Sequence, residues 1–217
     1  VTLPAVREHV NAIQAAILGL LALLLAFTFS LALQRHDSRS EAVVDEANAI
    51  GTAFLRTDLL KPPLRDEARQ ALARYVDLRV QEATLPLTDA ASRPALVAQA
   101  TGLQGTLWTI AARAAQADAA SHGAAQFVQA VHDLIDSFGR RDAALARHVP
   151  ELVTTLLFAT FLLSGGILGY AAGVFDHRPS LVTYVLVVLM VVLVFIVLDL
   201  DRPRRGVIQV SHQSLVS

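Results

Sequence analysis

The sequence predicts an all-α membrane protein with three transmembrane helices and a helical domain between the first and the second. Three long stretches of the 217 residues contain no charged residue, although the chain as a whole is 17% charged. It is also 54% hydrophobic with a mean hydropathy of +0.49, whereas soluble domains are about 45–50% apolar and about 25% charged. Between the stretches, apolar residues recur at helical spacing rather than in strand alternation.

The three charge-free stretches are residues 10–33, 152–175 and 180–198. A helix rises about 1.5 Å per residue, so about 20 residues cross a hydrocarbon core of about 30 Å. The first stretch lies too far into the chain and is too long for a cleaved signal peptide. If all three were core helices of a soluble protein, little chain would remain to cover them. We therefore expect three transmembrane helices.

Arginines near the ends of these stretches predict the orientation, because short cytoplasmic loops carry an excess of basic residues. The first stretch is followed by Arg35 and Arg39, and the second is preceded by Arg140, Arg141 and Arg147. The third is followed by Arg202, Arg204 and Arg205. The turn at residues 176–179 contains only Arg178. We expect residues 34–149 and the tail at 199–217 in the cytoplasm, and the turn outside. Because the sequence begins with Val1 rather than methionine, we also expect a fourth span upstream.

Residues 34–149 read as four helices, the first of which continues out of the membrane. Its apolar face comprises Val43, Ala47, Ile50 and Phe54, and the pair Pro62-Pro63 ends it. The other helices are expected at residues 64–85, at 92–119, and from residue 124 toward Pro150. They are rich in alanine and only modestly apolar, so we expect a small core together with contacts between copies of the chain.

The second and third stretches differ in their packing signals. The second contains Gly165, Gly169 and Gly173, a doubled GxxxG that lets helix backbones approach closely in lipid. This spacing predicts helix packing, but leaves open whether the partner helix belongs to the same chain. The third stretch is apolar all round and is expected to face lipid.

The first stretch has a stripe of small residues with larger apolar residues beside it. The small residues are Ala15, Gly19, Ala22, Ala26 and Ser30, and Gly19, Leu23 and Phe27 lie one turn apart. Two interpretations stay open: a face that contacts another helix, or the lining of a central pathway in an oligomer. In the second, a ring of Leu and Phe would form an apolar constriction that can gate by dewetting. None of the stretches contains an ionisable residue, which favours a passive pathway over a proton-driven one.

Two segments resemble the signatures of the bacterial bestrophin-like domain family, and the resemblance covers essentially the whole chain. They are EANAIGTAFLRTDLL at residues 46–60 and LDLDRPRRGVIQVSHQSL at 198–215. A shorter segment at residues 23–41, LLLAFTFSLALQRHDSRSE, is similar to the pore helix of bestrophins, which are pentameric anion channels. The resemblance implies a homo-oligomeric ion channel of a bacterial inner membrane that conducts inorganic anions.

The same resemblance implies roles for individual residues. Gly19, Leu23, Phe27 and Ser30 would line the pore, and Arg35 and Glu41 would place charge at its inner mouth. The sequence also departs from the bestrophin pattern. Gly19 is not a bulky neck residue, His36 and Asp37 replace the aromatic pair that follows the arginine, and no acidic run follows the last span to clasp calcium.

Other classes of function find little support. The chain has no cysteine, its net charge of −1 provides no field for nucleic acid, and it has no motif of an enzyme or a cofactor site.

We expect His132 and Asp136 to form a surface pair rather than a metal site. Asp45, Glu46 and Asp58 are expected to form surface salt bridges with Arg39, Arg56 and Arg65. Asp199 and Asp201 are interpreted as an interfacial anchor or as part of an inner mouth.

Two hypotheses follow for the function. The first is the homo-oligomeric anion channel, whose partners are the lipid bilayer, other copies of the chain and inorganic anions. The second is a non-conducting membrane scaffold or sensor that binds a partner through its cytoplasmic helices. A binding assay that depends on residues 64–149 in the absence of ion flux would favour the second.

Overall fold

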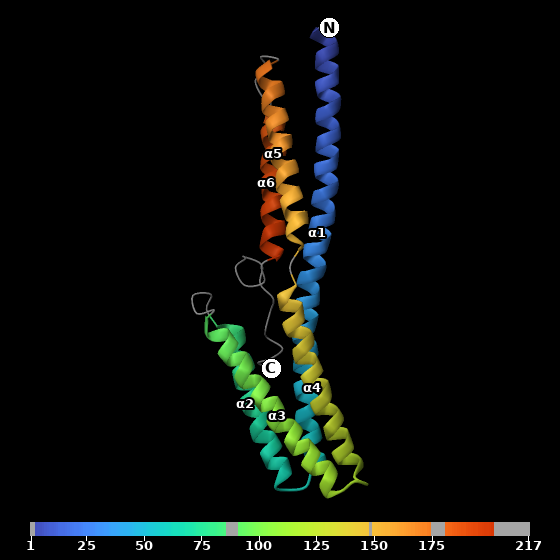
Figure 1. The fold of residues 1–217 in the computed structure, drawn as a ribbon, viewed down its shortest axis with the longest axis vertical. Helices are drawn as coiled ribbons and strands as arrows, with labels where there is room; N and C mark the ends of the chain where they lie inside the picture. The colour runs from blue at the N-terminus through green and yellow to red at the C-terminus, as the bar shows by residue number, and fades with distance from the viewer. Residues whose placement is uncertain (1–2, 86–90, 148, 175–180, 202–217) are drawn as a thin grey trace. The chain divides into compact units, whose positions relative to one another are not determined.

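The computed structural model describes residues 3–85, 91–147, 149–174 and 181–201. In this part of the chain all regular structure is helical (Figure 1). The elements are α1 (Leu3–Arg56), η1, a 3-10 helix (Thr57–Leu59), α2 (Leu64–Thr84), α3 (Arg93–Ala117), α4 (His122–Ala146), α5 (Glu151–Val174) and α6 (Leu181–Asp201). The all-helical fold class is confirmed. The turn at residues 176–179, Arg202, Arg204 and Arg205 lie outside the described residues.

The chain divides into two compact units, which are described separately. The first unit comprises α1 up to His36 together with α5 and α6. The second comprises α1 from Asp37 onward together with η1, α2, α3 and α4.

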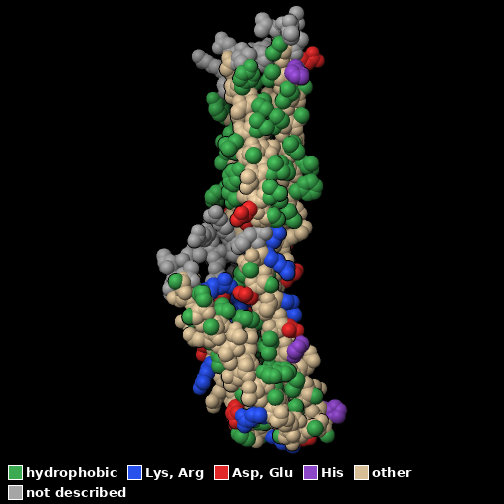
Figure 2. Space-filling model, viewed as in Figure 1, with side chains coloured by type: hydrophobic (Ala, Val, Ile, Leu, Met, Phe, Trp, Pro, Cys, Tyr) green, Lys and Arg blue, Asp and Glu red, His purple; other side chains and the backbone are tan. Residues whose placement is uncertain are grey.

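The first unit contains the three apolar stretches, and each is long and apolar enough to cross a membrane. Its three helices share a core made of Leu21, Leu25, Ala32, Leu157, Val194, Val197 and Leu200. Large apolar side chains also cover its outside: Phe27 is 61% exposed and Phe195 is 60% exposed. On the face seen in Figure 2, hydrophobic side chains dominate this unit, whereas basic and acidic ones gather on the other unit. Such a surface requires lipid or another apolar partner, so the chain is a membrane protein.

Buried hydroxyl groups in the first unit are bonded within their own helices. Thr28 Oγ1 donates to the carbonyl of Leu24 at 2.7 Å, and Thr160 Oγ1 donates to that of Leu156 at 2.8 Å. Ser164 Oγ donates to the carbonyl of Thr160 at 2.8 Å. Because lipid offers no hydrogen-bonding partner, these bonds allow polar residues on the packed faces of α1 and α5.

The second unit is a bundle of four helices joined by short connections. Its core includes the fully buried side chains of Leu72, Tyr75, Leu107, Phe127 and Leu134. Helix α1 ends at Arg56, before the proline pair, and η1 leads the chain toward α2.

The start of α4 is fixed by a cap and by a close contact with η1. Ser121 caps the helix, because its Oγ accepts a hydrogen bond from the backbone N–H of Ala124 at 3.2 Å. A Cβ at Gly123 would lie 2.8 Å from the carbonyl oxygen of Leu59. Glycine at this position therefore lets α4 approach the backbone of η1.

Candidate functional site

The proposed pore-lining residues lie together on an exposed face of α1. Leu23 is 52% exposed and Phe27 61% exposed, whereas Leu21 and Leu25 are buried against α5 and α6 at 0% and 7%. Gly19 and Ser30 are exposed as well. The remaining members of the small-residue stripe, Ala15, Ala22 and Ala26, are also exposed. This face is therefore not the surface through which α1 packs in its own chain.

The two proposed inner-mouth charges have different surroundings. Glu41 is exposed, whereas Arg35 is half-buried, and its Nε is buried without a hydrogen-bond partner among the described residues. At 3.6 residues per turn, Arg35 lies about 120° around the helix from Leu23. Arg35 thus does not share the face of α1 on which Leu23 and Phe27 lie.

The glycines of the doubled GxxxG in α5 have open space beside them, and Gly165 borders a hollow that Leu18 of α1 and Met190 of α6 also line. Gly165, Gly169 and Gly173 are exposed, and a Cβ added to any of them would meet nothing within 4 Å. Within the described residues no helix packs on them. The described part of the chain thus supplies no close helix partner for the doubled GxxxG, and the packing that this motif predicts stays a prediction.

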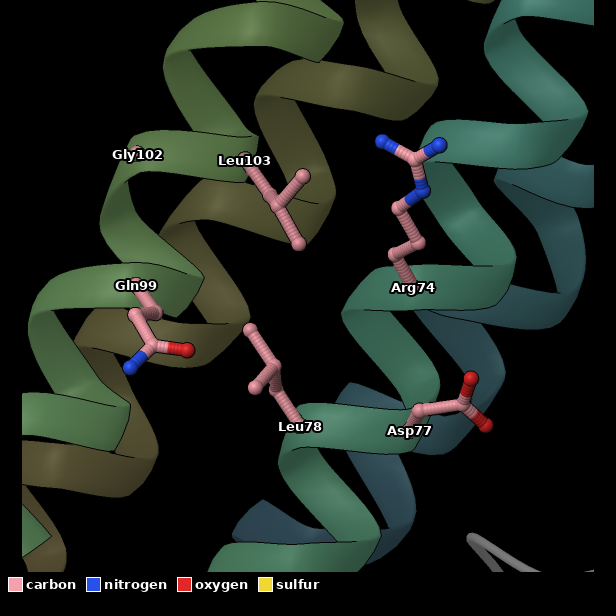
Figure 3. A pocket seen from close by; sticks show the side chains of 6 residues that line it. All are labelled: Arg74, Asp77, Leu78, Gln99, Gly102 and Leu103. Atoms are coloured by element: carbon pink, nitrogen blue, oxygen red, sulfur yellow. The ribbon is translucent and has the colours of Figure 1, made fainter.

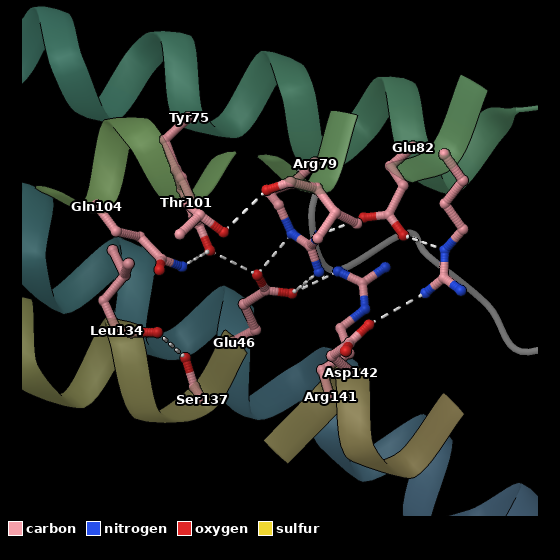
Figure 4. A network of polar contacts seen from close by, with 12 residues as sticks. Glu46, Tyr75, Arg79, Glu82, Thr101, Gln104, Leu134, Ser137, Arg141 and Asp142 are labelled. Atoms are coloured by element: carbon pink, nitrogen blue, oxygen red, sulfur yellow. Dashed lines mark hydrogen bonds and ion pairs between the residues drawn. The ribbon is translucent and has the colours of Figure 1, made fainter. Parts of the chain in front are cut away.

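A buried ionic network lies at the centre of the second unit (Figure 4). Glu46 of α1 is 0% exposed and accepts two hydrogen bonds from Arg79 of α2, from Nε at 2.7 Å and from Nη2 at 3.0 Å. It also accepts hydrogen bonds from the Tyr75 hydroxyl at 2.8 Å and from Nη1 of Arg141 on α4. One carboxylate therefore joins three helices of the bundle.

The network extends from Arg79 toward the start of α3. Arg79 Nη1 pairs with Glu82, which also accepts a hydrogen bond from Arg93 Nε at 2.9 Å. Arg93 Nη2 then lies 3.5 Å from Asp142 Oδ1. The guanidinium of Arg79 also stacks over the Phe138 ring, 4.7 Å from its centroid. All four helices of the second unit thus contribute to one polar cluster.

The network shifts the pKa values of its members in predictable directions. Burial alone would raise the pKa of Glu46, but hydrogen bonds and charge from Arg79 and Arg141 outweigh burial and lower it. The pKa of Glu82 is lowered in the same way, against burial, by Arg79 and Arg93. Burial, followed by the charge of Glu46, raises the pKa of Tyr75. Both glutamates are therefore ionised at neutral pH, and Tyr75 remains a donor.

The sequence interpretation of Glu46 and Asp58 as surface partners of Arg39, Arg56 and Arg65 was wrong. Glu46 is buried with Arg79 and Arg141, and Asp58 pairs with Arg69. The buried Arg39 instead donates to the backbone carbonyls of Ala144 at 3.3 Å and of Arg147 at 2.7 Å, near the C-terminus of α4. There the partial negative charge of the helix end favours a cation.

A signal for the network was present in the helical register. Val43, Glu46, Ile50 and Ala53 are all buried and follow one face of α1. Arg79 occupies the corresponding position on α2, one turn after Tyr75. A charged residue at a core position of an amphipathic helix indicates a buried partner, because an unpaired buried charge is very costly.

Two smaller expectations concern residues that the structure describes. His132 and Asp136 are both exposed and lie 3.6 Å apart on α4, as expected for a surface pair. Among the described residues no group of three potential metal ligands occurs. Asp201 at the end of α6 accepts a hydrogen bond from the backbone N–H of Val149 at 2.8 Å, which ties the end of α6 to the segment before α5.

Helices α2 and α3 also form an open groove on the surface of the second unit (Figure 3). It has a volume of about 460 Å³ and is lined by Arg74, Asp77, Leu78, Gln99, Gly102 and Leu103. A second groove of about 420 Å³ on the same helix pair shares Arg74 and Leu103 with the first. The first groove combines apolar side chains with Arg74 and Asp77, and the second combines them with Glu67, Arg74 and Arg113.

Three lipid-compatible helices on a common core, joined to a helical bundle with an internal ionic network, define an α-helical membrane protein. Residues 4–215 match the bestrophin-like domain family. The chain belongs to the bestrophin-like domain family. No protein of curated function and no solved structure matches it significantly.

Proposed function

We propose that the protein is a homo-oligomeric ion channel that conducts anions, with its pore lined by α1. The observation that supports this proposal is the exposed face of α1 that contains Gly19, Leu23, Phe27 and Ser30. Neither α5 nor α6 covers it, and residues 23–41 resemble a bestrophin pore helix.

An oligomer is required because three helices do not enclose a water-filled path by themselves. Copies arranged around a symmetry axis would turn one face of α1 from each chain toward the axis. Rings of Leu23 and Phe27 would then form an apolar constriction that opens by wetting and closes by dewetting. The exposed glycines of α5 offer a surface for contact between neighbouring chains.

The proposed orientation places the second unit in the cytoplasm. Arg39, Arg140, Arg141 and Arg147 lie in that unit, close in sequence to the ends of the apolar stretches. In a bacterial inner membrane, Arg35 would then lie near the cytoplasmic end of the pore. Its positive charge would raise the local concentration of anions there.

The experiment is anion flux through the purified chain reconstituted in liposomes. Leu23→Ala and Phe27→Ala are each expected to raise flux about tenfold, because removing about 1.4 kcal/mol from a dewetting barrier has that effect. Val188→Ala is the control, since Val188 is exposed on α6 at 61% but lies outside the proposed pore. Absence of flux under every ionic gradient, or equal flux in all four proteins, would contradict the proposal.

The second candidate function is a membrane scaffold or sensor. It is favoured by the two open grooves over α2 and α3, which the described residues of the second unit leave unfilled. In that case, a partner would bind through residues 64–149 while the liposomes show no flux.

A further inference from the structure

Two polar side chains interrupt the exposed apolar face of α1. Ser30 and Gln34 are both exposed, and Gln34 Nε2 donates a hydrogen bond to Ser30 Oγ at 3.5 Å. They lie one turn apart in the first unit, where the charge-free stretch at residues 10–33 ends. The pair thus adds a second polar residue, Gln34, to the face that sequence analysis assigned to a pore.

The helical register puts this pair on the same face as the proposed constriction. At 3.6 residues per turn, Ser30 and Gln34 lie about 20° to either side of Leu23 around the helix, and Phe27 lies about 40° from it. Arg35 lies about 120° away. A space lined by the Leu23 face therefore also meets the polar pair, whereas Arg35 lies off that face.

The pair is bonded differently from the buried hydroxyl groups of the same unit. Thr28, Thr160 and Ser164 each donate to a carbonyl of the preceding turn of their own helix, which satisfies a hydroxyl group in lipid. Among the described residues, the side chain of Ser30 forms its one hydrogen bond with Gln34. Its O–H group, the second amide N–H of Gln34 and the amide carbonyl are left for a partner outside the described residues.

Hydrocarbon cannot supply that partner. A donor or acceptor that faces lipid tails stays unsatisfied, which is costly, whereas water or an ion can bond to it. In the proposed channel, an anion at the constriction of Leu23 and Phe27 has shed part of its hydration shell. Hydroxyl and amide N–H groups one turn further along α1 can replace that shell. Because both side chains are neutral, they bind an ion weakly enough for it to leave again.

We propose that Ser30 and Gln34 form a polar collar that binds the permeating anion next to the apolar constriction, with Gln34 as a specificity-determining residue. The proposal rests on the proposed function and names the groups that contact the ion. The Ser30 O–H and a Gln34 N–H donate to one monovalent inorganic anion, such as chloride or nitrate. Specificity for anions comes from the orientation of these donors, since neither side chain is charged.

Thiol labelling tests whether the collar faces water, and it does not require ion flux. The chain has no cysteine, so Ser30→Cys in membranes can be treated with a water-soluble, negatively charged methanethiosulfonate. Phe195→Cys is the matched control. Phe195 is 60% exposed on α6, and both positions lie about one turn before the end of their charge-free stretches. We expect Ser30→Cys to react about tenfold faster, because the reactive thiolate forms in water and not in lipid. Equally slow labelling of both would overturn the proposal.

Protection by an anion tests the contact itself. Potassium nitrate in place of potassium gluconate, whose anion is bulky, should slow the labelling of Ser30→Cys saturably. Adding Gln34→Leu to Ser30→Cys removes the remaining donor of the collar, so the protection should disappear. Labelling that is equally fast in nitrate and gluconate would show that no anion binds there and would overturn the proposal.

Ion selectivity in liposomes tests the role of Gln34 in a conducting protein. Gln34→Leu removes the amide donors, and the ratio of chloride to potassium permeability is expected to fall about tenfold. Gln14→Leu is the matched control: it makes the same change on α1 at a half-buried position about 180° around the helix from Leu23, and its ratio should match that of the wild type. An unchanged ratio in Gln34→Leu would overturn the proposal.

Failure of the proposed function gives a different pattern of results. Absence of flux in every protein, together with fast labelling of Ser30→Cys that nitrate slows, would contradict the channel and support an anion site on α1. Flux with an unchanged permeability ratio in Gln34→Leu would support the channel and contradict the polar collar.

Discussion

Replacing Glu46 with glutamine is expected to lower the free energy of unfolding of the second unit by about 3–5 kcal/mol. The substitution keeps the shape of the side chain but removes its charge, so Arg79 and Arg141 lose the carboxylate that faces both of them. The amide group also introduces donors where the network supplies only donors. Breaking a buried ion pair on one side is costly because the remaining charges stay buried without compensation.

Denaturant unfolding of the full chain in detergent, followed by Trp108 fluorescence, measures this effect. Asp45→Asn is the matched control, because it neutralises the adjacent carboxylate, which is exposed on α1. Its effect should stay within about 0.5 kcal/mol, as for most surface substitutions. If Glu46→Gln unfolds at the same denaturant concentration as Asp45→Asn, the network does not stabilise the bundle.

Acid is expected to destabilise the second unit through the same two glutamates. The pKa values of Glu46 and Glu82 lie below their ordinary value of 4.5 in the folded protein. A lowered pKa means that the folded state binds protons less readily than the unfolded state. The stabilisation is therefore fully present above about pH 4.5 and is lost as the pH falls through the folded pKa values. Each unit of pKa difference corresponds to about 1.4 kcal/mol.

The measurement is the denaturant midpoint between neutral pH and pH 3. For the wild type we expect little change from these groups down to about pH 4.5, followed by a steep fall. The slope should be shallower in Glu46→Gln, which cannot take up that proton. Equal acid slopes in the two proteins would show that Glu46 titrates alike in the folded and unfolded states.

Local sequence signals predicted most of the helical architecture. The charge-free stretches indicated the apolar parts of α1, α5 and α6, and the pair Pro62-Pro63 indicated the break between α1 and α2. These signals are local because capping, helix breaking and apolar length each depend on a few neighbouring residues.

The ionic network and the packed face of α1 depend on contacts between distant segments. Glu46 and Arg141 are 95 positions apart, and nothing near either residue specifies the other. On α1 the sequence offered both a small-residue stripe and apolar residues for packing. The structure packs α1 through Leu21 and Leu25, because these side chains fill the space against α5 and α6.

The central claim is that the exposed face of α1 surrounds the axis of an oligomer. The chain contains no cysteine, so single-cysteine variants can be treated with a bis-maleimide cross-linker directly in membranes. Phe27→Cys is expected to yield covalently linked chains on a denaturing gel, whereas Val188→Cys on the outer surface of α6 should remain monomeric. Monomeric Phe27→Cys in the same membranes, with its thiol accessible to lipid-soluble maleimide, would place this face against lipid and contradict the account.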